Sequence, residues 1–321
     1  MGILHSGILN SILDVHVKAI CEKERFLTRV ARRILPKTVS LYRDHMKMIK
    51  NESIDAVFIT TPIHTHLEIV VDLARADNTL SLFLEKPLAA SGREAQEACK
   101  AVSNLKGIHM VGFQKRFSPI FQRAKELLDG NSIGELIFFR ANAFSSDVLR
   151  EGASWRFSKG KGGVLLDLAP HALDLLLWLF GEPSSVMGIK KRVYSREVDD
   201  YAHAVISFTS GLNGHLDACW SLAGYRLPEI SIEVHGRSGS ITVTDDFVRL
   251  DKTSGVESGA PRIWYKQSLD TSVSFLLADP EYTREDEAFL RHARERTQLG
   301  PSFHEAAKVN ELIDRITERG M

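Results

Sequence analysis

Two kinds of hydrophobic spacing alternate along the first part of the chain. Stretches in which apolar residues recur every three to four positions predict helices at 3–13, 24–35, 44–50, 66–76 and 91–104. Short alternating or continuous apolar runs predict strands at 15–21, 55–60, 80–84 and 108–112. The run from Asp55 to Thr60 is almost entirely apolar, which is typical of a parallel strand covered on both faces. Strands that alternate with helices in this way predict a doubly wound α/β domain with a parallel sheet.

The spacing changes after Phe113. A predicted helix at 118–129 and a strand at 136–144 lead to an apolar helix within 162–181. Strands are then predicted without intervening helices, at 186–194, 202–209, 214–220, 230–235, 240–244 and 247–251, and two helices follow, at 283–296 and 303–319. Consecutive strands indicate a large, mostly antiparallel sheet in a second, α+β domain. We therefore predict one domain at 1–115 and a second at 116–321.

Composition excludes several classes of protein. Among the 321 residues, 41 Lys and Arg balance 41 Asp and Glu, so no surplus of positive charge indicates a nucleic-acid or membrane partner. The three cysteines form no C-x-x-C pair and are typical of reduced thiols in a cytoplasmic protein. The longest apolar tract is interrupted by charged residues and is too short to span a bilayer.

That tract, 162–181, carries three ionisable side chains. Asp167, His171 and Asp174 are spaced by four and three residues, which places them on one face of a continuous helix. Burying such groups is costly unless they are paired or face a cleft. A histidine beside a carboxylate is the commonest apparatus for proton transfer near neutral pH, so we predict an active-site helix. The alternative is a helix whose core polar groups are simply paired.

Further candidates follow the predicted parallel strands, because ligands of such sheets bind beyond the carboxyl ends of the strands. Glu22 ends the strand at 15–21, and a carboxylate there can accept hydrogen bonds from an adenosine ribose. Lys86 follows the strand at 80–84 and can stabilise an alkoxide, although an exposed lysine paired with Glu85 is the alternative. His64 and His66 form an H-x-H pair without a third ligand at a supporting spacing, so we predict no metal. We expect Thr65 and His66 to begin the next helix near the cofactor.

Together these motifs resemble the Gfo/Idh/MocA family, the glucose–fructose oxidoreductase and inositol dehydrogenase family. The resemblance covers almost the whole chain and rests on short motifs in the family's order: 55–62 with His66, Glu85-Lys86-Pro87, 111–117, Trp155-Arg156, Gly162-Gly163 through Asp167, His171 and Asp174, and Gly181-Glu182-Pro183. It implies a Rossmann-type first domain that binds a nicotinamide cofactor, and Glu22 predicts NAD in preference to NADP. It also implies a sugar, polyol or nucleotide-sugar substrate and a homodimer or homotetramer.

The resemblance also assigns the site residues. It implies the catalytic residues Lys86, Asp167 and His171. The implied cofactor-binding residues are Gly2, Glu22, Thr61, Pro62, His66, Glu85 and Lys86. The implied substrate-binding residues are Lys86, Arg116, Trp155, Asp167 and His171.

The beginning of the chain departs from the family pattern. The family opens with a strand and a G-x-G-x-x-G turn, whereas here Gly2 corresponds to the third glycine, and the first strand and first two glycines are absent. We therefore expect the chain to be an N-terminal truncation of a longer protein. Two other functions stay open: an NAD-binding sensor without catalysis, and an NAD-assisted glycosidase of the same fold.

Overall fold

The computed structural model describes residues 1–150, 155–159, 162–225, 227–252, 260–269, 272–273, 276, 278–298 and 300–318. The chain divides into two units, and the division is not a single cut in the sequence. The first unit comprises residues 1–89, 93–112 and 273–307, and the second comprises 90–92, 113–272 and 308–321. Within the described residues, no helix is long and apolar enough to cross a bilayer.

The first unit alternates strands and helices as predicted. Its elements are α1 (Gly2–Ser11), β1 (Ala19–Cys21), α2 (Arg25–Ile34), β2 (Ser40–Tyr42), α3 (His45–Asn51), β3 (Ala56–Ile59), α4 (His66–Ala76), β4 (Ser81–Glu85), α5 (Gly92–Val102, on the border of the second unit) and β5 (His109–Gly112). All strand pairs are parallel, but they form two sheets, β1–β2 and β3–β4–β5. Strand β2, which has only three residues and no long apolar run, was not predicted from the sequence.

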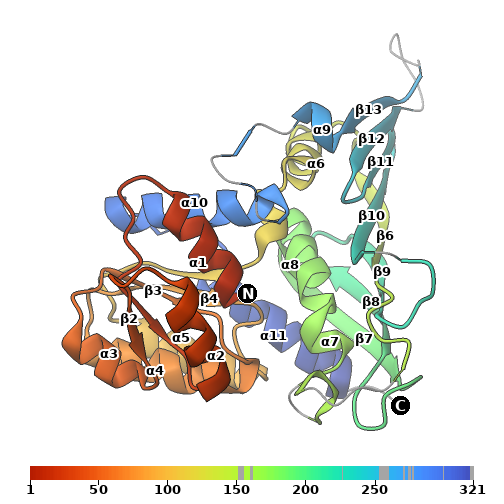
Figure 1. Cartoon of the computed structure of the whole chain (residues 1–321). Coiled ribbons are helices and arrows are strands. Elements are labelled where there is room, and N and C mark those ends of the chain that lie inside the picture. The colour runs from red at the N-terminus through yellow and green to blue at the C-terminus, as the bar shows by residue number, and fades with distance from the viewer. Residues whose placement is uncertain are drawn as a thin grey trace. The chain divides into compact units, whose positions relative to one another are not determined.

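The core of the first unit is completed by a helix from near the end of the chain. Phe58 and Phe83 stack with ring centroids 4.7 Å apart, and Phe289 of α10 (Pro280–Glu295) meets both rings edge-on. Figure 1 shows the blue helix α10 beside the red helix α1. The sequence analysis placed this segment in the second domain. Its apolar face packs against β3 and β4, so it belongs to the first unit.

The second unit is built on an eight-stranded sheet with the order β13-β12-β11-β10-β6-β9-β8-β7. Among the described strands of this sheet, only β6 and β9 pair in parallel. The strands are β6 (Leu136–Phe144), β7 (Pro183–Lys191), β8 (Tyr201–Phe208), β9 (Asn213–Cys219), β10 (Glu229–Gly236), β11 (Gly239–Val243), β12 (Phe247–Lys252) and β13 (Arg262–Tyr265). β13 and the short helix α9 (Lys266–Leu269) were not predicted. The mostly antiparallel sheet confirms the predicted α+β architecture.

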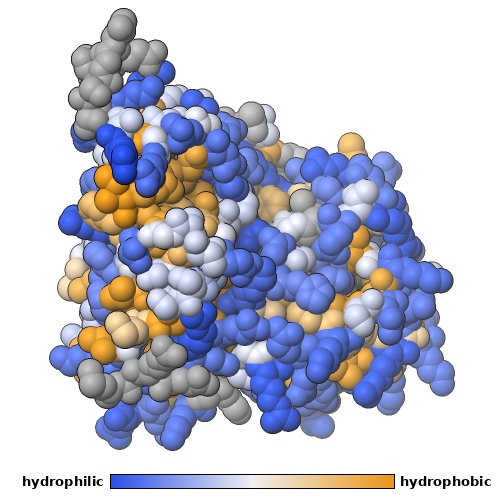
Figure 2. All heavy atoms as spheres, turned by 180° about the vertical axis from the view of Figure 1, so that it is seen from behind, coloured by the Kyte–Doolittle hydropathy of each residue, from blue (hydrophilic) through white to orange (hydrophobic). Residues whose placement is uncertain are grey.

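One face of this sheet is packed and the other is not. Helices α6 (Pro119–Asp129) and α8 (Ala169–Phe180) lie on the same side of it, and α11 (Phe303–Glu318) ends the chain (Figure 1). Phe139, Phe180 and Phe208 meet with ring centroids 5.2–5.7 Å apart and form part of the core between α8 and the sheet. Figure 2 shows hydrophobic patches on the surface of the sheet unit, viewed from behind.

The predicted continuous helix at 162–181 is wrong in one respect. It is two helices, α7 (Val164–Asp167) and α8, which meet at Leu168. Pro170 lies in the first turn of α8, where its missing N–H and its ring are tolerated, whereas in a helix interior the ring would clash with the carbonyl of Leu166. Asp167 and His171 therefore lie on successive helices and not one turn apart on one helix.

Candidate functional site

The first unit places its predicted cofactor residues around the carboxyl ends of parallel strands. Thr61 and Pro62 follow β3, Lys86 follows β4, and Glu22 follows β1. The Thr61 and Pro62 side chains are exposed, and Glu22 and Lys86 are half-buried. Glu22 Oε1 accepts a hydrogen bond of 2.8 Å from the Glu24 backbone N–H, which fixes the orientation of the carboxylate.

His66 joins the loops that follow β3 and β4. Its ring nitrogens lie 2.8 Å from the Thr61 carbonyl oxygen and 3.0 Å from the Pro87 carbonyl oxygen, and the side chain is buried. Burial lowers the pKa of His66, and the two carbonyl groups offset this only in part. His66 thus holds the two loops together, while His64 is exposed and does not converge with it. Among the described residues, no group of three or more His, Cys, Asp or Glu is placed to hold a metal ion.

Gly2 begins helix α1 in close approach to strand β3. A Cβ added at Gly2 would lie 2.9 Å from Thr60 Oγ1, so a larger residue would push the helix away from the strand end. The first turn of α1 contains no acidic residue. A close helix start without negative charge fits a dinucleotide phosphate, which binds at helix N-termini. The residues present therefore fit NAD, with Glu22 suited to its ribose.

Glu85, a predicted cofactor-binding residue, lies in the interior of the first unit. Its carboxylate is 7% exposed and accepts a hydrogen bond of 2.8 Å from His5 Nε2, inside the first unit. Glu85 therefore contributes to the interior of the first unit, whereas the next residue, Lys86, lies at the strand end. Cofactor binding by Glu85 stays a prediction.

In the second unit, two glycines and Asp199 fix the start of helix α7. Gly163 has φ +105°. The Val164 N–H donates a hydrogen bond of 2.9 Å to the Asp199 carbonyl oxygen, and the Leu165 N–H donates one of 2.9 Å to Asp199 Oδ2. A Cβ at Gly163 would lie 2.8 Å from Asp199 Oδ1, and one at Gly162 would lie 1.9 Å from the Arg156 carbonyl oxygen. The Gly-Gly pair is thus required by two close approaches. Burial raises the pKa of Asp199.

Asp167, at the end of α7, forms an ion pair with Arg156. Arg156 Nε donates to Asp167 Oδ2 over 2.5 Å, and its guanidinium lies 5.2 Å from the centre of the Trp220 ring. His171, in the first turn of α8, is half-buried and meets the Phe113 ring edge-on at 6.5 Å. The Arg156–Asp167 pair and the His171 imidazole therefore lie at the adjoining ends of α7 and α8. The catalytic roles of Asp167 and His171 stay predictions.

Arg116 and Asp174 form a buried, bidentate ion pair. Arg116 Nε and Nη2 donate to the two Asp174 carboxylate oxygens over 2.8 and 2.7 Å. The pair joins the residues that follow β5 to the middle of α8 and so fixes the helix that carries His171. Substrate binding by Arg116 stays a prediction. The Trp155 side chain lies outside the described residues.

The structure adds residues that the sequence analysis did not single out. Arg156 was part of a motif without a role, and Asp199 stands in an ordinary acidic pair, Asp199-Asp200. His5 lies one turn after Gly2, a spacing that could have drawn attention to it. Nothing in the sequence links His5 to Asp286, its other hydrogen-bond partner.

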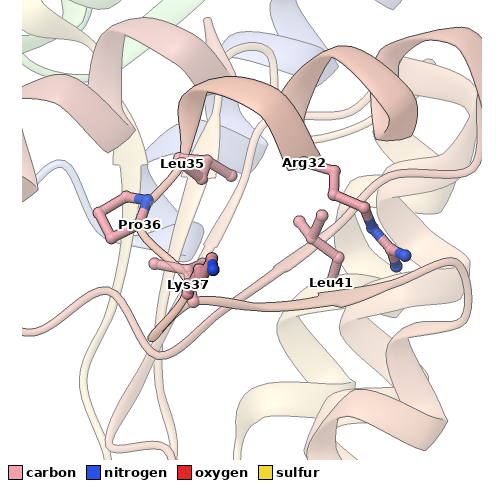
Figure 3. A pocket seen from close by; sticks show the side chains of 6 residues that line it. Arg32, Leu35, Pro36, Lys37 and Leu41 are labelled. Atoms are coloured by element: carbon pink, nitrogen blue, oxygen red, sulfur yellow. The ribbon is translucent and has the colours of Figure 1, made fainter.

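A cavity of about 240 Å³ lies apart from these residues (Figure 3). It is lined by Arg32, Leu35, Pro36, Lys37, Val39 and Leu41, from the end of α2 to β2. Val39 precedes β2, so this cavity opens near the amino end of the strand. Because cofactors of parallel sheets bind at the carboxyl ends, it is not the predicted cofactor site.

Comparison with known proteins identifies relatives of both units. Residues 9–113 match the model of the oxidoreductase family with an NAD-binding Rossmann fold, and residues 121–242 match the Gfo/Idh/MocA C-terminal domain. The chain is 30% identical over 270 residues to inositol 2-dehydrogenase of Rhizobium meliloti, a match that covers 81% of this chain and 77% of that protein.

Two other relatives are matched over a shorter part of their length. Levoglucosan dehydrogenase of Pseudarthrobacter phenanthrenivorans is 31% identical over 227 residues, and scyllo-inositol 2-dehydrogenase (NAD(+)) of Bacillus subtilis is 33% identical over 207. Each match covers 62% of this chain but only 57% and 58% of those relatives. The solved structure of levoglucosan dehydrogenase in complex with NADH and levoglucosan superposes with a TM-score of 0.84 at 26% identity, over 98% of this chain and 92% of that one.

Proposed function

Because the chain belongs to the Gfo/Idh/MocA oxidoreductase family, we propose that it is an NAD-dependent dehydrogenase of a sugar or polyol. The observation that supports this most strongly is the likeness, over 98% of the chain, to a dehydrogenase whose complex contains NADH and levoglucosan. Inositol dehydrogenases among the relatives support the wider class of polyhydroxylated rings.

NAD, when bound, supplies the hydride acceptor for the substrate carbon. In the first unit, Gly2, Glu22, Thr61, Pro62 and His66 would hold the dinucleotide. The Glu22 carboxylate accepts hydrogen bonds from the ribose hydroxyls and disfavours the 2′-phosphate of NADP. His66 keeps the loops after β3 and β4 in place around it.

The remaining chemistry belongs to three side chains. His171 takes the proton from the substrate hydroxyl as the carbon loses hydride, which leaves a carbonyl product. The Lys86 ammonium group stabilises the negative charge that develops on the oxygen. Asp167, held by Arg156, orients the imidazole or a second hydroxyl.

We further propose that the protein works as a homodimer or homotetramer in the cytoplasm. The outer face of the large sheet exposes Met187, Ile189 and Val205 by 62%, 50% and 42%, and Met187 is the cross-strand neighbour of Val205. Adjacent exposed apolar residues on a sheet face are typical of an interface between subunits. The three cysteines are free thiols, which is consistent with a reducing compartment.

The test is incubation of the full chain with NAD and a panel of inositols, levoglucosan, monosaccharides and disaccharides. Net NADH formation with a carbonyl product is the expected result. Bond cleavage without net NADH supports the glycosidase alternative, and NADH binding without turnover of any compound supports the sensor. Either of these two outcomes overturns the proposed dehydrogenase.

A further inference from the structure

His5 lies between two carboxylates in the interior of the first unit. Its Nδ1 is 2.8 and 3.0 Å from the two carboxylate oxygens of Asp286 on α10, and its Nε2 is 2.8 Å from Glu85 Oε1 at the end of β4. His5 is 1% exposed and Asp286 is fully buried. Three segments that are far apart in sequence therefore meet at one imidazole ring.

This geometry favours a charged histidine. An ionised carboxylate only accepts hydrogen bonds, so both ring nitrogens must carry a hydrogen in order to donate. Burial alone would lower the pKa of His5, but the hydrogen bonds to Asp286 and Glu85 outweigh it and raise this pKa to about 9. Burial raises the pKa of Asp286 to about 6, offset in part by His5. At neutral pH the site is an imidazolium between two carboxylates.

Aromatic rings surround the charged group. The Phe58 and Phe83 ring centroids lie 5.7 and 5.1 Å from that of His5, and the Tyr282 ring meets it edge-on at 6.2 Å. Further acidic groups of α10 and its start contribute to the field around these residues: Asp279, Glu281, Glu285 and Glu287. In the protein interior the ion pairs are strong when complete, and loss of one partner leaves an uncompensated buried charge.

The position of His5 in the fold gives this cluster a function. His5 lies one turn after Gly2, where α1 begins against the end of β3. Glu85 directly precedes Lys86. The imidazolium thus ties the helix that would receive the cofactor phosphates to the strand end that carries the proposed catalytic lysine.

We propose that His5 and Asp286 are positioning residues, which hold the cofactor-binding start of α1 and the Glu85–Lys86 strand end in one fixed arrangement. This inference rests on the proposed function. A purely structural core does not require charge, since apolar residues of similar volume often pack with equal or greater stability than a buried ion pair. A charged cluster, however, fixes the orientation of the His5 ring as well as its distance from Asp286 and Glu85, because each ring nitrogen points at one carboxylate.

The first test is nitrogen NMR of the full chain with 15N-labelled histidine. We expect one imidazole to remain doubly protonated to about pH 9, and the absence of this signal from His5→Gln should assign it to His5. If every histidine of the folded protein is neutral at pH 8, the proposal is wrong. This measurement needs no substrate.

The second test is NADH binding as a function of pH, followed by fluorescence. For the wild type, we expect constant affinity to about pH 8 and weakening near pH 9, as His5 loses its proton. In Asp286→Asn the weakening should begin at least one pH unit lower, and kcat near neutral pH should fall by about 10-fold or more with little change in sugar KM. The matched control is Asp72→Asn, which removes the charge from a more exposed pair with His45 in the same unit.

The outcomes separate this inference from the proposed function. An Asp286→Asn variant that melts earlier but keeps the wild-type pH profile and kcat would show that the cluster is structural only. Failure of the proposed function looks different: the wild type binds NADH and oxidises no sugar. In that case a shifted NADH profile in Asp286→Asn still supports the positioning of the cofactor-binding helix.

Discussion

At the scale of single residues, the pKa values of two buried histidines of the first unit are shifted in opposite directions, because their partners differ. His66 faces two backbone carbonyl groups, and burial lowers its pKa. His5 faces two carboxylates, which raise its pKa to about 9. Burial is nearly the same for both, so the charge of the acceptors decides the direction of the pKa shift.

The raised pKa of His5 predicts a pH dependence of stability. The folded pKa of about 9 lies above the value of about 6.5 for an unfolded histidine, so this contribution is complete below pH 6.5 and is lost as pH rises through 9. Between these values the free energy of unfolding should fall by up to about 1.4 kcal/mol per pH unit. Urea titrations at several pH values measure this slope. His5→Gln should lack it, and an unchanged slope in His5→Gln would contradict the assignment.

A second prediction at this scale concerns His171. If it is the general base, His171→Ala should lower kcat by roughly 10²–10⁴-fold, with little change in melting temperature, because the side chain is half-buried. Steady-state kinetics on the substrate found in the panel measures the effect. His64→Ala serves as the control, because His64 is exposed on the 3₁₀ helix Ile63–Thr65. Near-native turnover in His171→Ala would exclude it as the base.

At the scale of elements, helix α7 depends on contacts made from outside it. A helix of four residues has little stability of its own, because nucleation is unfavourable. Asp199 supplies both acceptors for its first N–H groups, and Arg156 pairs with Asp167 at its other end. The position of Asp167 is therefore set by residues on either side of it in the chain.

This dependence predicts the effect of Asp199→Ala. The variant leaves the buried Leu165 N–H without its acceptor, which costs about 1–3 kcal/mol, and loosens α7, so kcat should fall together with stability. Asp44→Ala is the matched control, since Asp44 caps α3 by accepting from the Lys47 N–H over 3.0 Å. That control should lose about 1 kcal/mol of stability and keep its kcat. Equal kcat in both variants would mean that α7 does not position a catalytic group.

At the scale of the whole molecule, the large sheet has helices on one face and exposed apolar side chains on the other. Alternation along β8 buries Ala202, Ala204 and Ile206 and turns Val205 outward. On β7, Met187 and Ile189 also point outward. An antiparallel sheet with one apolar outer patch gains stability when a second copy covers that patch.

This pattern predicts that substitution on the sheet face changes the oligomeric state. Met187→Asp places a charge in the proposed interface, so we expect sedimentation velocity to show a smaller species than the wild-type dimer or tetramer. Met46→Asp, on α3 of the first unit, introduces the same charge at another exposed methionine and should leave the assembly unchanged. A wild type that sediments as a monomer would contradict the proposed assembly.

The sequence by itself determined the order and type of most elements in both units. Hydrophobic spacing is a local property, so α4 and β6 were predicted with their observed bounds. The same reading missed β2 and β13, which have three and four residues and therefore too few positions to establish a period. Hydrophobic spacing also predicted one continuous helix across Pro170, although the proline's missing N–H and its ring favour a new helix start there.

Only the tertiary structure decided which side chains meet. His5 and Asp286 are 281 positions apart in sequence, and α10 packs with the first unit although it follows the second in the chain. Asp174 pairs with Arg116, 58 positions away. Sequence motifs identified Glu85, Lys86, Asp167 and His171 as candidate site residues, because only some residue types can transfer a proton or stabilise a charge. The charge of His5 and the orientation of Asp167 depend on partners that only the folded chain brings within hydrogen-bond distance.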